Sequence, residues 1–252
     1  MLRPILADLH IHTVLSACAE VEMIPPLIVR QACRIGLGLI AITDHNACHN
    51  AEAVIRAAAG TGLSVLPGME LQTKEEVHVV CLFDTISQCM EWQRQVFDLL
   101  PPLANREETF GAQYVVDASG EWVRTEERLL AAAADISLEQ AASAVHALGG
   151  LVIPAHVDRP SFSLLANLGF VPENLEADAL EVTPRFAPET GFQKWPQLER
   201  WPLVVNGDAH RLSEMRNRTL FKMASPSVQE LSLALRGEEG RKVVVDWRHT
   251  NS

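Results

Sequence analysis

The sequence is short of basic residues. It has 21 Lys and Arg against 32 Asp and Glu in 252 residues, which gives a net charge of −11 with histidine neutral. This balance argues against a broad basic face that runs along nucleic acid, so binding of long duplexes is not expected. The sequence also lacks any uninterrupted apolar run near the roughly 20 residues of a membrane helix, so no membrane partner is expected.

The sequence also lacks the cysteine pattern of a disulfide framework. The five cysteines form no CxxC pair and leave an odd thiol under any full pairing scheme, which favours a reducing compartment. The chain reaches Asp8 and His10 before any apolar stretch long enough for a signal peptide. These features predict a soluble, cytoplasmic protein.

The apolar runs indicate the fold class. Apolar residues make up 48% of the chain, enough for the core of one large domain. Strand-length apolar runs alternate with segments of helical period, which is typical of an α/β fold with parallel strands. Strands are predicted over residues 5–11, 39–43, 63–66, 77–83, 151–155, 179–183 and 203–206. Helices are predicted over residues 25–35, 50–59, 86–100, 137–148 and 226–235, the fourth with a capping box at Ser137 and Gln140 and a stop at Gly149.

One segment interrupts this alternation. Residues 101–135 contain two short runs, 113–117 and 121–123, separated by Ala118-Ser119-Gly120, which predicts an inserted β-hairpin. No linker rich in Gly or Ser divides the chain, so residues 1–252 are expected to form a single domain with an insertion at about 101–135. The insertion carries Trp122 and Arg124, which we expect at the rim of the site.

Most of the nine histidines lie where predicted strands end. The residues found at or just past strand ends are His10, His12, Asp44, His45, Glu70, His156, Asp208 and His210. Since the carboxyl ends of parallel strands meet on one face of a barrel, these side chains are expected to converge there. His78 lies early in its run, which suggests an antiparallel or offset strand. Three histidines are not assigned to the site: His49, His146 and His249.

The spacing of His10 and His12 has a direct physical meaning. Alternate residues of a strand point to the same side, so both imidazoles can bind one ion. HxH alone is a weak signal. Four further histidines and two carboxylates, nearly all at the ends of predicted strands, make a metal site the natural interpretation.

Six segments occur in the order typical of a known family. They are DLHIHT, TDHN, PGME, a following VH, PAH and GDAH, and they extend from Asp8 to His210. In this the sequence resembles the polymerase and histidinol phosphatase (PHP) family. The resemblance implies a distorted seven-stranded (β/α)7 barrel that holds two or three metal ions and hydrolyses phosphoesters. The seven strands predicted from apolar runs agree with it.

The resemblance also implies a set of ligands. One metal would be held by His10, His12, Glu70 and Asp208, a second by Glu70, His78 and His156, and a third by His45 and His210. The sequence departs from the family where members usually offer His or Asp, because it has Ala17 and Cys18 there. Cys18 could be a thiolate ligand of the third metal or a buried structural thiol.

Such a cluster suits phosphate chemistry. Glu70 and Asp208 contribute two negative charges, so two or three divalent ions leave the pocket at +2 or +4, and at +3 with three ions and an ionised Cys18. A di- or trinuclear site can generate hydroxide from bound water and stabilise the leaving oxygen. Mixed imidazole and carboxylate ligands favour Zn, Mn or Fe over Mg or Ca.

Further side chains near these segments could assist. Cations that could bind phosphate are Arg159, Arg185 and Lys74. Arg159 is the preferred one, because it lies close to His156 and a guanidinium binds phosphate in bidentate fashion, although a salt bridge with Asp158 is an alternative. Asp8 and Asp44 are expected to orient ligand histidines, and Asp44 could also assist proton transfer.

The expected function is metal-dependent hydrolysis of a small phosphorylated metabolite, a nucleotide or the end of a short single strand. The alternatives are an amidohydrolase, which also has HxH on its first strand, and a binding module that has lost catalysis. The sequence does not specify the substrate, the metal or the oligomeric state.

Overall fold

The computed structural model of the protein describes residues 1–248. Its strands are β1 (Arg3–Ile11), β2 (Leu39–Ile42), β3 (Ser64–Gln72), β4 (His78–Leu82), β5 (Tyr114–Val116), β6 (Trp122–Thr125), β7 (Leu151–Pro154), β8 (Leu180–Glu181), β9 (Leu203–Val204), β10 (Thr219–Met223) and β11 (Lys242–Val245). Its helices are α1 (Pro25–Arg34), α2 (Ala51–Ala57), α3 (Ile86–Leu99), α4 (Glu107–Phe110), α5 (Leu138–Ala147), α6 (Leu164–Asn167), α7 (Pro188–Lys194) and α8 (Val228–Arg236), with 3-10 turns η1 (Pro196–Arg200) and η2 (Leu212–Glu214).

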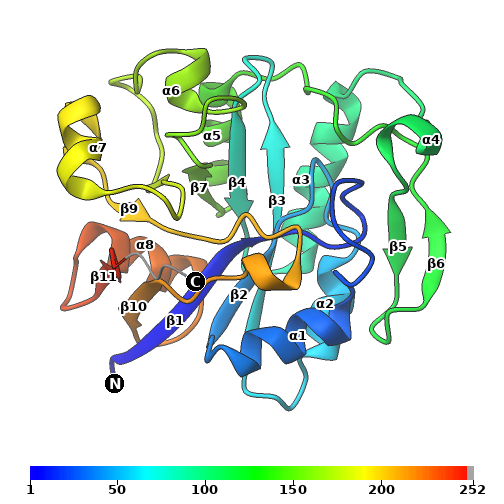
Figure 1. The fold of residues 1–252 in the computed structure, drawn as a ribbon, viewed down its shortest axis with the longest axis horizontal. Coiled ribbons are helices and arrows are strands. Elements are labelled where there is room, and N and C mark those ends of the chain that lie inside the picture. The colour runs from blue at the N-terminus through cyan, green and yellow to red at the C-terminus, as the bar shows by residue number, and fades with distance from the viewer. Residues whose placement is uncertain (249–252) are drawn as a thin grey trace.

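Seven of the strands form one curved sheet, in the order β11-β10-β1-β2-β3-β4-β7 (Figure 1). The predicted α/β class with a distorted seven-stranded barrel is therefore confirmed. The prediction that the strands are parallel is correct only in part, because β4 and β10 run antiparallel to the strands on either side of them. A short turn explains the reversal of β4, since β4 begins at His78, a few residues after β3 ends at Gln72, and returns along it. β10 has no such turn, because it pairs with β1 from the other end of the chain and α8 separates it from β11.

Two members of the sheet differ from those predicted. Residues 179–183 and 203–206 form shorter strands, β8 and β9, which pair with each other in a separate two-stranded parallel sheet. β10 and β11 take their places, and the apolar runs missed both. β11 lies at the sheet edge with its side chains alternately exposed, so its sequence KVVV offers only a short apolar signal.

β3 continues beyond its predicted end at residue 66 to Gln72. Pro67 and Gly68 resemble the end of a strand in the sequence, but both lie within it. A Cβ atom on Gly68 would come within 2.8 Å of the Cys81 carbonyl oxygen in β4 and 2.9 Å of Thr43 Cγ2. Gly68 is therefore the residue that lets β3 pair closely with β4 just before Glu70.

The two faces of the sheet bury different clusters. The inner face packs Leu39, Leu66, Val80 and Ile153 against α8. The outer face packs against α1, α2, α3 and α5, where Trp92 of α3 is fully buried. Alternation along each strand assigns residues to the two faces, and the inner face is the one that continues into the candidate site.

The helix boundaries follow from their caps. α5 begins with the predicted capping box, in which the Ser137 hydroxyl accepts from the Gln140 N–H and the Gln140 side chain accepts from the Ser137 N–H. Gly149 follows its end with a φ of 75°, a conformation that favours glycine. A search of the helices within residues 1–248 finds none that combines the length and hydrophobicity of a membrane span.

The predicted insertion contains the antiparallel hairpin β5–β6, which lies at one side of the molecule beside α4, opposite α7 (Figure 1). Asn50 fixes it to the body of the protein, since its amide donates to the Tyr114 carbonyl and accepts from the Val116 N–H. Trp122 is 64% exposed on the hairpin. The single-domain organisation of residues 1–252 remains a prediction.

One ion pair between α5 and the loop before β8 makes stability depend on pH. His146 Nε2 lies 2.9 Å from Asp178 Oδ2, and the hydrogen bond to this carboxylate raises the pKa of the imidazole. A folded-state pKa above the unfolded value contributes stability below pH 6.5 and loses it as the pH rises through the folded pKa. We expect His146→Gln to lower the free energy of unfolding by about 0.5 kcal/mol more at pH 5.5 than at pH 9, because the pair is partly exposed. Urea denaturation at both pH values measures this, and a pH-independent difference would contradict it.

Candidate metal centre

The predicted site residues come from six strands or the loops after them. His10 is in β1, Glu70 is in β3 and His78 begins β4. His45 follows β2 and forms a parallel bridge with Glu70. Because β4 is antiparallel, its first residue lies at the same edge as the ends of its neighbours, and His78 pairs with Gln72. The early position of His78 therefore has the antiparallel explanation that the sequence suggested.

A bulge in β1 turns the HxH pair toward the inner face. The pairing of β1 with β2 shifts register between Asp8 and Ile11. Before the shift Leu9 packs in the inner cluster, whereas Ile11 after it packs in the outer cluster. One extra residue in β1 thus reverses the alternation, and His10 and His12 face inward above the apolar cluster.

Four side chains form the first group of candidate ligands: His10, His12, Glu70 and Asp208. The Nε2 atoms of His10 and His12 lie 3.2 Å apart, and each lies 3.4 Å from Asp208 Oδ1. Glu70 Oε1 lies 3.1 Å from His10 Nε2, and its Oε2 lies 3.3 Å from His12 Nε2. Nitrogen ligands at about 2.0–2.1 Å from a tetrahedral ion are separated by about 3.3 Å, so this spacing fits ligands of one ion.

Glu70 also belongs to a second group. His45 Nδ1 lies 2.9 Å from Glu70 Oε2, and His78 Nδ1 lies 2.9 Å from Glu70 Oε1. His156 Nε2 is 3.2 Å from the same Oε1 atom, although His156 is not in a group with three mutually close ligand atoms within residues 1–248. The structure therefore places Glu70 between the two groups, where a bridging carboxylate would lie.

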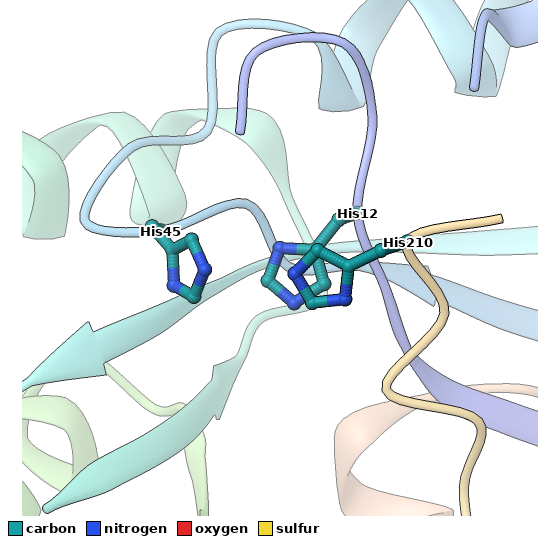
Figure 2. Close-up of side chains that lie close together, drawn as sticks. All are labelled: His12, His45 and His210. Carbon is teal, nitrogen blue, oxygen red and sulfur yellow. The ribbon is translucent and has the colours of Figure 1, made fainter. Parts of the chain in front are cut away.

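The third group is His12, His45 and His210, shown in Figure 2. The rings of His12 and His210 stack with centroids 4.0 Å apart, and His45 lies 4.5 Å from His12. Cys18 is exposed, so the alternative prediction of a buried structural thiol is wrong. Its side chain contacts His45, but it joins no group of mutually close ligand atoms within residues 1–248. Burial opposes protonation of His45, but the charge of Glu70 and hydrogen bonds with Cys18 and Glu70 together raise the pKa of His45 to about 9.

The two carboxylates make this centre favourable for positive charge. Burial opposes ionisation of Glu70, but the imidazoles of His78 and His10 hold its pKa well below its usual range. Burial likewise opposes protonation of His12, but Asp208 and Glu70 raise its pKa to about 9. Protons and divalent cations thus compete for the same place, as at other imidazole and carboxylate metal sites.

Sequence reasoning missed Glu181, which holds His10 in place. This buried carboxylate at the end of β8 has both oxygens 3.1 Å from His10 Nδ1. It also accepts hydrogen bonds from Asn206 Nδ2 at 2.7 Å and from the His156 N–H at 3.1 Å. A carboxylate on Nδ1 directs the Nε2 atom of a histidine toward its ion. The strand-end signal was hidden, because the predicted run 179–183 continues past Glu181, whereas β8 ends at this residue.

Asp44 takes an orienting position. Its Oδ1 accepts hydrogen bonds from the Thr13 N–H and the Ser16 hydroxyl, and its Oδ2 accepts from the Thr13 hydroxyl. The Ser16 hydroxyl lies 2.9 Å from His12 Nδ1. Since Asp44 is fully buried and both oxygens are engaged, this placement favours orientation of His12 over proton transfer.

Asp8 links β1 to the loop that carries Asp208. Its carboxylate accepts hydrogen bonds from the backbone N–H groups of Gly207 and Arg216, at 2.9 and 2.7 Å. Burial raises the pKa of Asp8 to about 7 despite these bonds. Asp208 itself has a φ of 45°, uncommon for a residue other than glycine, so the Asp8 bonds hold a strained turn at the site.

The three predicted phosphate-binding cations have different surroundings. Arg159 Nη1 donates to Asp208 Oδ2 at 2.7 Å, whereas Asp158 accepts from the Thr183 N–H and hydroxyl instead. Lys74 lies exposed in the turn between β3 and β4, and Arg185 lies exposed after β8. The structure therefore connects Arg159 to the candidate ligands, and phosphate binding by all three remains a prediction.

The unassigned histidines lie elsewhere. His49 pairs with Glu126 of the insertion at 3.2 Å, and His146 pairs with Asp178 as described above. His249 lies outside the described residues.

Comparison with known proteins gives a family match. The model of the family described as PHP domain matches residues 8–162. The uncharacterized protein YqxK of Bacillus subtilis is 23% identical over 281 residues, which cover 98% of this chain and 65% of YqxK.

Two solved structures show the same fold. The lesion-specific endonuclease PfuEndoQ of Pyrococcus furiosus matches with a TM-score of 0.71 and 21% identity over 96% of this chain and 58% of that chain. A Bifidobacterium adolescentis protein described as a metal-dependent phosphoesterase matches with a TM-score of 0.56 and 18% identity, covering 81% of this chain and 87% of that chain. This chain spans less than two thirds of the length of YqxK and of the endonuclease.

The position of Glu181 leads to a prediction about metal affinity. Glu181→Ala leaves His10 Nδ1 without its carboxylate partner, so we expect affinity for Zn²⁺ or Mn²⁺ to fall about 10- to 100-fold. Competition titration with a chromophoric chelator measures this affinity. Glu199→Ala, at an exposed glutamate, is the control and should match wild type. Equal affinity in Glu181→Ala and wild type would show that Glu181 does not orient a ligand.

Proposed function

Because the chain belongs to the PHP domain family, we propose that it is a metal-dependent phosphoesterase. Its substrates in this proposal are small phosphorylated metabolites, nucleotides or ends of short single strands. The observation that carries the proposal is a pair of buried carboxylate oxygens, Glu70 Oε2 and Asp208 Oδ1. Within residues 1–248 neither accepts a hydrogen bond of good geometry, although imidazole nitrogens surround both at ligand spacing. A buried carboxylate oxygen without a partner is costly, and a cation between these groups removes that cost.

The donor set fits two or three divalent ions. Imidazole nitrogen mixed with carboxylate oxygen suits Zn, Mn or Fe. In the proposed assignment the first ion has the ligands His10, His12, Glu70 and Asp208. The second has Glu70, His78 and His156, with His45 also close to Glu70. A third would be held by His45 and His210, with Cys18, whose side chain contacts His45, as the candidate thiolate ligand.

The bound ions would supply an activated water, polarise the phosphoryl oxygens and stabilise the leaving group. The protein's own residues prepare the site for this. Glu181 and Ser16 fix the rings of His10 and His12 through their Nδ1 atoms, which leaves both Nε2 atoms facing the centre. Arg159 lies at the edge of the site, 39% exposed, with one guanidinium nitrogen on Asp208. This arrangement supports binding of a phosphate oxygen by its other nitrogens.

The charge of the site supports an anionic substrate. With Glu181 counted, three carboxylates contact the candidate imidazoles, so two divalent ions leave a net charge of +1 and three leave +3. Arg159 adds a further positive charge at the rim. A protein with a net charge of −11 therefore presents a cationic pocket, which attracts phosphate more strongly than a neutral amide.

The principal prediction is metal-dependent turnover of phosphoesters. We expect the protein loaded with Mn²⁺ or Zn²⁺ to hydrolyse members of a panel of phosphomonoesters and phosphodiesters, and chelation to abolish this. Glu70→Gln should lower kcat/KM at least about 100-fold, because it removes the central carboxylate charge. Glu199→Gln serves as the control. Turnover of amides or lactams without turnover of phosphoesters would favour an amidohydrolase, and metal binding without any turnover would favour a binding module.

A second prediction concerns Arg159. Arg159→Ala should raise KM for phosphoesters about 10-fold, because it removes a charged hydrogen bond to phosphate, and Arg159→Lys should recover only part of the loss. Arg200→Ala, at an exposed arginine, controls for the change in net charge. An unchanged KM in Arg159→Ala would rule out phosphate binding by this residue.

A further inference from the structure

An aromatic ring lies at the edge of the candidate centre. The Phe162 ring stacks on the His78 ring, with centroids 5.0 Å apart and planes inclined by 25°. The Phe162 carbonyl also accepts a hydrogen bond from the His78 N–H at 3.2 Å. Yet 39% of this residue is exposed. Since one face of the ring lies on His78, a ligand that contacts this ring would meet its opposite face or its edges.

The backbone holds Phe162 there in an uncommon conformation. Its φ is 52°, which is rare for a bulky residue and persists only where the surroundings fix it. The next residue, Ser163, caps α6 by accepting from the Ala166 N–H, and its hydroxyl donates to the Arg159 carbonyl. Asn167 at the end of α6 donates to the carbonyls of Glu75 and Glu76 in the β3–β4 turn. These hydrogen bonds hold the backbone that carries Phe162, and so keep its ring against His78.

The same short segment carries three kinds of group. His156 places its Nε2 on Glu70, Arg159 reaches Asp208, and Phe162 covers His78. The imidazole suits a metal ion, the guanidinium suits a phosphate, and the exposed aromatic ring suits a flat aromatic group. A nucleotide has both a phosphate and a flat aromatic base, whereas a sugar phosphate has no aromatic ring.

We propose that Phe162 is a stacking surface for the nucleobase next to the scissile phosphate. This inference rests on the proposed phosphoesterase function and narrows its substrate class to nucleotides and unpaired nucleic-acid ends. Aromatic side chains stack on bases with little regard to sequence, so the surface would accept any base. A base within a duplex has both faces covered by its neighbours, so it would have to leave the stack to reach Phe162.

Two substrates that differ only in the base test this. One is a thymidine dinucleotide, and the other has the base next to the scissile phosphate replaced by hydrogen. With the metal-loaded protein, Phe162→Ala should raise KM for the first roughly 10-fold and leave the second unchanged. Phe162→Tyr should behave as wild type, and Phe162→Leu, which keeps apolar bulk without the ring, should behave as Phe162→Ala.

The controls separate stacking from support of His78. Phe170→Ala removes another exposed phenylalanine, 56% accessible, for which no ring contact is found within residues 1–248, and it should change neither KM. If Phe162→Ala impairs both substrates equally, the ring only supports His78 and the inference is wrong. If it impairs neither, the base does not lie on Phe162.

A binding measurement keeps this inference separate from the proposed function. Isothermal titration with thymidine monophosphate and with deoxyribose 5-phosphate needs no turnover. Wild type should bind the nucleotide more tightly, and Phe162→Ala should lose most of the difference. If the protein prefers the nucleotide but hydrolyses no phosphoester, the phosphoesterase proposal is wrong and the stacking surface stands. If it hydrolyses phosphoesters but shows no preference for the nucleotide, the stacking surface is wrong and the phosphoesterase proposal stands.

Discussion

A carboxylate buried among imidazoles is the interaction on which the candidate site depends. Glu70 has no exposed surface, and its two oxygens lie within 3.3 Å of nitrogen atoms of five histidines, namely His10, His12, His45, His78 and His156. Neither the carboxylate alone nor so many imidazoles alone would be stable in a buried pocket. Together they make a site where positive charge is favoured. A divalent cation supplies two positive charges at one position, whereas each proton adds one charge to one imidazole.

Three local features of the sheet bring the histidines to Glu70. The reversal of β4 brings His78 to the edge where the parallel strands end, and the bulge in β1 turns His10 and His12 inward. Gly68 allows β3 and β4 to approach just below Glu70. Each device is a local departure from regular strand geometry, which is typical of strands that position functional side chains.

The sequence predicted the fold class and the convergence of the strand-end residues, because apolar runs and polar residues at their ends are local features. It did not predict β10 and β11, whose apolar signal is short, nor the direction of β4 beyond the hint from His78. Glu181 was missed because it lies inside the predicted strand run 179–183 and its partner His10 is 171 residues away in the chain. The exposed ring of Phe162 had no signal at all, because its stacking on His78 depends on a backbone turn that only the structure reveals.

In the proposed assignment Glu70 would be a ligand of two metal ions. Anomalous scattering from crystals grown with Zn²⁺ or Mn²⁺ is the direct test. We expect two peaks on either side of the Glu70 carboxylate, one beside His10, His12 and Asp208 and the other beside His78 and His156. A single peak with Glu70 uncoordinated, or none among these residues in crystals whose metal content is established by absorption spectroscopy, would contradict it.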